Sequence, residues 1–149
     1  MTRPYFELTR LIERLHRRFL DVLRAELDQL DVSDINPVQC LLLSNIGEEE
    51  INVRNLMDRG YYLGSNASYN IKKLVESGYL IQQRSPYDRR STLIRVSPKG
   101  LDLCAKVAAA ELAHAERITA EDGGQELDAA CETLRNLERS WDYRSFPRS

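Results

Sequence analysis

The chain has 149 residues and a formal net charge of −2 at pH 7, and 42% of its residues are hydrophobic. This length suits one domain with a sizeable core, and the ordinary composition excludes a low-complexity chain. No apolar run reaches the length of a membrane span and the N-terminus lacks a signal-peptide apolar stretch, so we expect a cytoplasmic protein with no membrane partner.

The small net charge conceals an uneven distribution along the chain. Residues 65–100 contain seven Lys or Arg against two Asp or Glu, whereas residues 1–64 contain eight against eleven and residues 101–149 contain six against ten. A basic segment between acidic flanks is what an electrostatic footprint for nucleic acid requires.

The N-terminal part of the chain predicts two helices and a short strand. From Tyr5 to about Leu30 the apolar residues recur at alternating steps of three and four, which is typical of a long amphipathic helix. Asn36 followed by Pro37 is a helix-start signal. The shorter helix that follows is apolar on nearly all sides, so we expect it at the centre of the domain. Ile51 is expected to begin a strand that pairs with a later hairpin.

A helix-turn-helix is predicted next. Its first helix runs from Val53 to Arg59, with Asn52 as its cap. The turn from Gly60 to Gly64 contains Tyr61 and Tyr62, and we expect one of them to reach a phosphate. A helix, a tight turn and a second helix at this spacing are typical of DNA-binding proteins.

The second helix of this pair is predicted from Ser65 to Ser77, with Gly78 ending it in the left-handed conformation. One arc of the helix is apolar, and the opposite arc is hydrogen-bonding and cationic, as a helix in a DNA major groove must be. A plain amphipathic surface helix would show the same pattern. The polar arc consists of Ser65, Asn66, Tyr69, Lys72 and Lys73, with Ser68 and Asn70 on its flanks.

A β-hairpin is predicted after Gly78, and the segment Pro86–Ser91 forms its tip. Arg89 and Arg90 repel each other and add nothing to a core, so their position suggests an external anion such as DNA phosphate or a narrow minor groove. Asp88 is placed to hold the Arg90 guanidinium by a bidentate contact. A solvated charged loop is the alternative for this hairpin taken alone.

The C-terminal third predicts two more helices. Ser97-Pro98 repeats the start signal, Gly123-Gly124 interrupts the pattern, and the last helix carries apolar residues at coiled-coil-like steps as far as Trp141. Long helices at both chain ends have more apolar surface than a small domain can cover. Pairing with a second copy would bury the excess.

The cysteines and histidines do not form a recognisable chemical site. Cys40, Cys104 and Cys131 are an odd set without close spacing, and the chain has two histidines, so we expect neither a disulfide framework nor a metal site. Buried structural thiols are our first interpretation, and a redox switch at Cys40 is the alternative. Without a nucleophile elbow or a phosphate-cradling loop, we expect no enzyme and no cofactor.

The run from Asp88 to Gly100 resembles the wing signature of the MarR family of winged helix-turn-helix regulators, and Lys73–Leu80 resembles the end of that family's recognition helix. The motifs lie between about Asn52 and Gly100. The resemblance implies a mainly α (α+β) fold with long terminal dimerisation helices. Residues 31–97 would form the winged helix-turn-helix, and residues 1–30 and 98–149 the helical dimerisation region, intertwined as one domain.

The resemblance also implies a homodimeric transcriptional regulator that binds palindromic double-stranded DNA and responds to a small aromatic or phenolic effector, whose pocket residues are unknown. The alternatives are a winged-helix module that binds protein, which would need an apolar or acidic helix face, and a cysteine-based redox-sensing regulator. We expect Ser65, Asn66, Ser68 and Tyr69 to approach bases, Lys72, Lys73 and Arg89 to meet phosphates, and Arg90, oriented by Asp88, to enter the minor groove.

Overall fold

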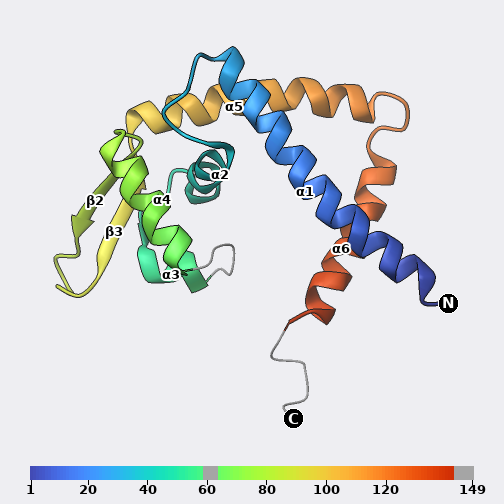
Figure 1. Cartoon of the computed structure of the whole chain (residues 1–149), viewed down its shortest axis with the longest axis horizontal. Coiled ribbons are helices and arrows are strands. Elements are labelled where there is room, and N and C mark those ends of the chain that lie inside the picture. Colours follow the sequence, from blue (N-terminus) through green and yellow to red (C-terminus); the bar gives the residue numbers. More distant parts are fainter. Residues whose placement is uncertain (59–63, 143–149) are drawn as a thin grey trace, which may run out of the picture. The chain divides into compact units, whose positions relative to one another are not determined.

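The structure, a computed structural model, describes residues 1–58 and 64–142 (Figure 1). It consists of two compact units, Met1–Ala108 and Ala109–Ser149. The predicted mainly helical fold with a small sheet is confirmed. The turn that contains Tyr61 and Tyr62 lies outside the described residues. The elements are α1 (Arg3–Gln29), α2 (Pro37–Ile46), β1 (Ile51–Asn52), α3 (Val53–Asp58), α4 (Gly64–Glu76), β2 (Leu80–Arg84), β3 (Thr92–Val96), α5 (Pro98–Thr119) and α6 (Gln125–Ser140).

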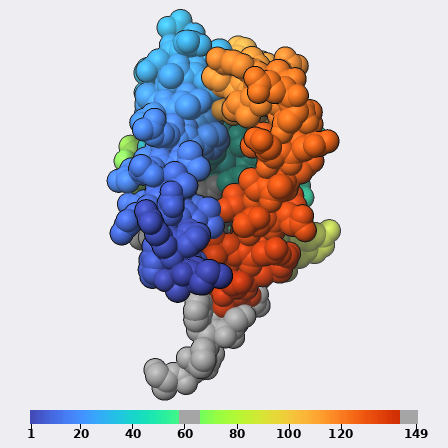
Figure 2. Space-filling model, turned by 90° about the vertical axis from the view of Figure 1, so that its right-hand side faces the viewer, coloured from blue at the N-terminus to red at the C-terminus, as the bar shows by residue number. Residues whose placement is uncertain are grey.

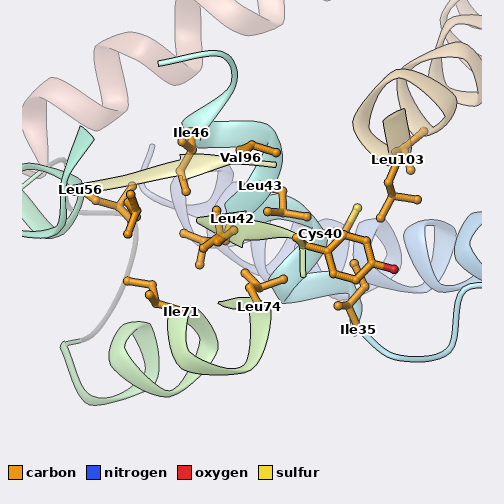
Figure 3. Packing of buried hydrophobic residues seen from close by; sticks show 14 of the residues in the cluster. Ile35, Cys40, Leu42, Leu43, Ile46, Leu56, Ile71, Leu74, Val96 and Leu103 are labelled. Atoms are coloured by element: carbon orange, nitrogen blue, oxygen red, sulfur yellow. The ribbon is translucent and has the colours of Figure 1, made fainter. Parts of the chain in front are cut away.

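Helix α2 lies at the centre of the first unit, as its all-round apolar pattern predicts. It begins with a capping box, in which the Asn36 side chain accepts from the Gln39 N–H at 2.8 Å and the Gln39 side chain accepts from the Asn36 N–H at 3.0 Å. Cys40, Leu42 and Leu43 are at most 1% exposed. Figure 3 shows these side chains meeting others from several elements, and the cluster includes Ile35, Leu56, Ile71, Leu74, Val96 and Leu103.

The sheet has three antiparallel strands in the order β1–β3–β2. The predicted short strand at Ile51 is confirmed, because Ile51 pairs with Ile94 of β3. In the hairpin, Leu80 pairs with Val96 and Arg84 pairs with Thr92. Alternate residues therefore face the core near the hairpin's base, while its tip extends beyond the core.

The end of α4 and the start of α5 are joined at the base of the hairpin. Gly78 has φ of +82°, which confirms the predicted left-handed end of α4. The Ser97 hydroxyl donates to the Gly78 carbonyl at 2.6 Å and accepts from the Gly100 N–H at 3.1 Å. A Cβ at Gly100 would lie 2.6 Å from the Tyr79 carbonyl oxygen, so only glycine permits this close approach.

Helix α1 is buried only near its C-terminal end, at Leu23, Glu26 and Leu27. Its preceding turns present large apolar side chains to solvent, including Phe6 at 56% exposure and Leu15 at 59%. The dark-blue surface in Figure 2 is this open part of α1. The predicted amphipathic helix is thus confirmed, but most of its apolar side is not covered by its own unit.

In the described part of the second unit, α6 has no buried residue. Leu127, Leu134 and Trp141 are each more than 40% exposed. Its first turn is held by Asp122, which accepts from the N–H groups of Gly124 and Glu126. These bonds favour the carboxylate, which lowers the pKa of Asp122. The apolar residues of the predicted coiled-coil-like seam are therefore exposed along α6.

The three cysteines differ in exposure. Cys40 is buried, as expected, but Cys131 is exposed on α6, so the prediction of buried thiols is wrong there. No residue of α6 is buried, so Cys131 has no core of its own helix to pack into. Burial raises the pKa of the half-buried Cys104 thiol, although a hydrogen bond with Ser44 opposes the shift. Within residues 1–58 and 64–142, no helix is both long and apolar enough to cross a membrane.

Candidate nucleic-acid interface

Helix α4 presents a polar side to solvent, as its sequence predicts. Asn66, Ser68, Tyr69, Lys72 and Lys73 are all exposed. The side chain of Ser65 lies outside what the structure describes. The apolar side packs on the core through Ala67, Ile71 and Leu74.

Asn70 does not lie on the exposed flank that the sequence indicated. It is 8% exposed, and its side-chain oxygen accepts from the Gln39 Nε2 at 3.2 Å. Helical spacing places Asn70 beside the apolar arc. Its hydrogen bond with the side chain on α2 offsets the free-energy cost of burying its amide. That partner is 31 residues away, so sequence spacing did not reveal it.

The two lysines of α4 differ in their surroundings. Lys73 lies 3.8 Å from the Glu76 carboxylate and 5.8 Å from the centre of the Tyr69 ring. No ion pair of Lys72 occurs among the described residues, and its side chain lines a groove beside the hairpin. Lys72 is therefore the more available of the two cations for an external phosphate.

The hairpin tip is fixed by its own short side chains. The Ser85 hydroxyl accepts from the N–H groups of Tyr87 and Asp88, at 3.2 and 3.4 Å. Asp88 accepts from the Arg90 N–H at 2.9 Å and from the Ser91 hydroxyl at 3.3 Å. These bonds order the backbone of the turn while the side chains from Pro86 to Arg90 remain exposed.

The expected bidentate contact between Asp88 and the Arg90 guanidinium is wrong. Asp88 holds the main chain of Arg90, and no ion pair joins the two side chains in the described part of the protein. A carboxylate two residues before an amide forms this local turn more readily than it reaches a long side chain that points outward. Asp88 thus shapes the tip, and the Arg90 guanidinium stays available.

A groove of about 960 Å³ lies between α3, α4 and the hairpin. Its lining includes three cations from three different elements, namely Arg54, Lys72 and Arg90. Figure 1 shows α4 and the hairpin side by side at this end of the unit. Sequence reasoning did not single out Arg54, although its place in the first turn of the first predicted helix of a helix-turn-helix was a usable signal.

Tyr87 is a second residue that sequence reasoning did not assign to the interface. Its side chain is 97% exposed at the hairpin tip, two residues before Arg89 in the sequence. A fully exposed aromatic ring buries little apolar area in the folded chain, so it contributes little to folding stability. The Tyr87 ring would contribute binding free energy if a partner covered it.

A polar network fixes the base of the hairpin. The Tyr79 hydroxyl donates to Asp34 at 2.8 Å, and Lys99 lies 3.5 Å from the same carboxylate and 4.3 Å from the centre of the Tyr79 ring. Lys99 also donates to the Ser77 carbonyl at 2.9 Å. Burial, followed by the hydrogen bond and charge of Asp34, raises the pKa of Tyr79 to about 12. The network ties α4 and α5 to the segment before α2.

The interface therefore consists of an ordered cationic surface. Among the described residues, no group of three or more His, Cys, Asp or Glu is arranged to hold a metal ion. The surface made by the exposed side of α4 and the hairpin tip, here called the reading surface, displays charge and hydrogen-bonding groups. Such a surface suits the backbone and base edges of a nucleic acid.

Comparison with known proteins agrees with this geometry. Residues 35–100 match the model of a winged helix DNA-binding domain. Over 138 residues the chain is 44% identical to the exopolysaccharide II synthesis transcriptional activator ExpG of Rhizobium meliloti (strain 1021), an alignment that covers 92% of this chain and 71% of that protein.

Solved structures share the fold. The crystal structure of MarR is 21% identical with a TM-score of 0.66, and the alignment covers 92% of this chain and 96% of MarR. Streptococcus pneumoniae FabT in complex with DNA is 22% identical with a TM-score of 0.67, covering 89% of this chain and 95% of FabT. The helix-turn-helix, the wing and the identity to a transcriptional activator together establish that the chain belongs to the MarR-type winged-helix transcriptional regulators, a class of DNA-binding proteins that are not enzymes.

Proposed function

We propose that this protein is a cytoplasmic, homodimeric transcriptional regulator that binds a palindromic DNA operator and changes its affinity when a small aromatic or phenolic effector binds. The observation that carries the DNA-binding part is the reading surface, where α4 and the ordered wing present Lys72 and Arg90 to the same groove. The protein-binding alternative needs an apolar or acidic helix face, whereas the exposed side of α4 is polar and basic.

In the proposed complex, α4 enters a major groove and the wing meets the adjacent minor groove. Asn66, Ser68 and Tyr69, together with Ser65, approach base edges from the N-terminal half of the helix. Lys72, Lys73 and Arg89 neutralise phosphates, and Arg54 joins them from α3. Arg90 enters the minor groove from a turn whose backbone Asp88 holds in place.

The proposed dimer rests on apolar side chains that α1 and α6 each expose. Phe6, Leu15 and Phe19 of α1 are 41–59% exposed, and α6 exposes Leu127 and Leu134. A second copy that brings the same surfaces would remove them from water. Two-fold symmetry would then match half-sites about 34–36 Å apart, which is one turn of DNA.

The proposed effector acts by preferring one arrangement of the two reading surfaces over another. A ligand shifts such an equilibrium only as far as its affinities for the two arrangements differ. The relative named as an activator favours activation rather than repression for this chain, and genes for exopolysaccharide synthesis are the first candidates for its targets. A reporter carrying the selected operator, with and without this protein, tests the sign of the effect.

Selection of bound sequences from random duplex DNA at two salt concentrations tests the DNA-binding proposal. We expect a palindrome to be enriched, with affinity that falls as salt rises because phosphate contacts release counterions. Enrichment of a single, unrepeated half-site would contradict the dimer. A lack of enrichment together with salt-insensitive binding would favour the protein-binding alternative.

A panel of aromatic acids and phenols, added to the protein bound to that duplex, tests the effector. Release of the duplex by some members and not by aliphatic acids of equal charge is the expected result.

A further inference from the structure

One buried polar contact joins the recognition helix α4 to α2. The Gln39 side chain is 5% exposed and donates from Nε2 to the Asn70 oxygen at 3.2 Å. The neighbouring positions on the buried side of α4 are apolar, since Ala67, Ile71 and Leu74 are at most 5% exposed. The contact is therefore a directional bond that lies beside apolar contacts of α4.

The donor of this bond is held on its other side. Gln39 is the third residue of α2, and its Oε1 accepts from the Asn36 N–H at 3.0 Å while its own N–H donates to the Asn36 side chain at 2.8 Å. One end of the Gln39 amide thus completes the capping box, and the other end reaches α4. The position of its Nε2 is fixed by the first turn of the central helix.

Stability alone does not explain the pair. An apolar pair of similar shape at these positions would be about as stable, because the hydrogen bond gains little beyond the bonds that the same groups make with water. Apolar contacts are non-directional and tolerate rotation of one helix against another. A hydrogen bond weakens steeply when its angle changes, so this one resists rotation of α4 about its axis.

Asn70 also lies where such a restraint acts on the exposed side chains. By helical spacing, Asn66 and Lys73 are its neighbours toward the polar arc, and Ala67 and Leu74 are its neighbours toward the core. Asn70 therefore marks the border between the packed and the exposed side of α4. A rotation of the helix would move Asn66 and Tyr69 together relative to the wing.

We propose that the Gln39–Asn70 hydrogen bond sets the rotation of α4 and makes Asn70 a positioning residue for sequence discrimination, although it touches no base. This proposal rests on the proposed DNA-binding function. It predicts that discrimination between sequences depends on the bond, whereas binding to DNA of any sequence does not.

The test replaces the pair by apolar residues of similar size, in the variant Gln39→Met with Asn70→Leu. Thermal unfolding is measured first, followed by affinity for the duplex enriched by the wild type and for a random-sequence duplex of the same length. Because Gln39→Met also opens the capping box, Asn36→Ala is the matched control that weakens the cap and leaves Asn70 untouched. Asn70→Asp, which keeps an acceptor oxygen, is the conservative variant.

We expect the double variant to lose discrimination, measured as the ratio of the two affinities, by about tenfold or more, which corresponds to misreading at least one base pair. Its affinity for the random duplex should match the wild type, since Lys72 and Arg90 are retained. Asn36→Ala and Asn70→Asp should both keep the wild-type ratio. If the double variant does not fold, Asn70→Leu alone is judged by the same ratio.

A double variant with wild-type discrimination would overturn the proposal, and so would an equal loss of discrimination in Asn36→Ala, because that loss would follow from stability alone. The two proposals can fail separately. If the wild type enriches no sequence, the DNA-binding function fails and takes this inference with it. If the wild type discriminates and the apolar pair discriminates equally well, only the role of the hydrogen bond fails.

Discussion

The reading surface and the apolar side of α1 are both left uncovered by the first unit, yet they have opposite chemistry. The reading surface exposes Lys72, Arg89 and Arg90 on an ordered scaffold of hydrogen bonds. The α1 surface exposes Phe6 and Leu15, whose side chains have no charge and no hydrogen-bonding group. Each surface therefore indicates a different kind of partner, a polyanion for the first and another apolar surface for the second.

The two surfaces should respond differently to salt. Contacts with phosphate weaken as salt rises, because they exchange bound counterions for protein cations. Burial of apolar area does not depend on counterions and is, if anything, strengthened by excluded salts. Salt should thus act on DNA affinity and leave the association of two copies nearly unchanged, and variants of each surface should move only its own observable.

The largest effect is expected from a charge placed in the apolar surface of α1. Leu15→Asp should convert the proposed dimer to a monomer, because each carboxylate would have to be buried without a partner. Loss of the second half-site should lower affinity for the palindrome by about 100-fold or more. Analytical ultracentrifugation and titration of the enriched duplex measure the two effects.

Arg17→Asp is the matched control for this variant. It introduces the same side chain on the same helix, at a position where the wild type has an exposed ion pair with Glu13 at 3.5 Å. Such pairs contribute little to stability, so sedimentation and DNA affinity should both remain those of the wild type. A dimer in Leu15→Asp would show that copies associate through some other surface.

A change inside the unit should alter stability without altering either surface. Tyr79→Phe removes the hydroxyl that donates to the Asp34 carboxylate, and we expect it to cost about 2 kcal/mol of unfolding free energy. The raised pKa of Tyr79 adds a dependence on pH. Stability from this group should be complete below pH 10, the value for an unfolded tyrosine, and should be lost as pH rises toward about 12.

Denaturant unfolding of wild type and Tyr79→Phe between pH 8 and 12 measures this dependence. The two curves of stability against pH should converge as the wild-type tyrosine ionises. Parallel curves across the whole range would mean that the hydroxyl does not titrate in the folded protein as its surroundings imply. The salt slope of DNA binding at pH 8 should be the same for both.

Arg90→Ala tests the wing, and we expect it to weaken DNA binding by about tenfold and to relax preference at the base pairs that the wing meets. Arg135→Ala removes the same charge from α6 and should leave DNA affinity within about twofold of the wild type. Fluorescence anisotropy with the enriched duplex compares them. Equal affinities for Arg90→Ala and wild type would leave the wing without a role.

The sequence predicted the elements more reliably than the contacts between them. Asn36-Pro37, Gly78 and Ser97-Pro98 carry local signals, and each lies where the signal indicates because capping and left-handed turns depend on neighbouring residues. The short strand at Ile51 was also readable, since its partner hairpin has a clear alternating pattern.

The sequence did not predict the hydrogen-bond partners of two polar side chains. Asp88 was predicted to bind a guanidinium and instead holds a backbone N–H, and Asn70 was predicted at the flank of the exposed arc and instead binds Gln39. The Gln39 partner of Asn70 lies 31 residues away, and periodicity does not encode such a contact. The Asp88 contact is a local turn, which competes with a side-chain contact at the same sequence spacing. The base contacts of α4 and the division of the chain into reading and dimerisation regions stay predictions.

The smallest effects are expected from the two lysines of α4, and the two should not be equal. Lys72→Ala should lower affinity about threefold to tenfold and reduce the magnitude of the salt slope by ~0.9, the value for one lost phosphate contact. Lys73→Ala should do less, because Lys73 already lies near Glu76 and over the Tyr69 ring, so its charge is partly compensated in the free protein. Titrations at several salt concentrations give both slopes. Equal slopes for the two variants would show that the Glu76 contact is given up on binding, and a wild-type slope for Lys72→Ala would remove that side of α4 from the reading surface.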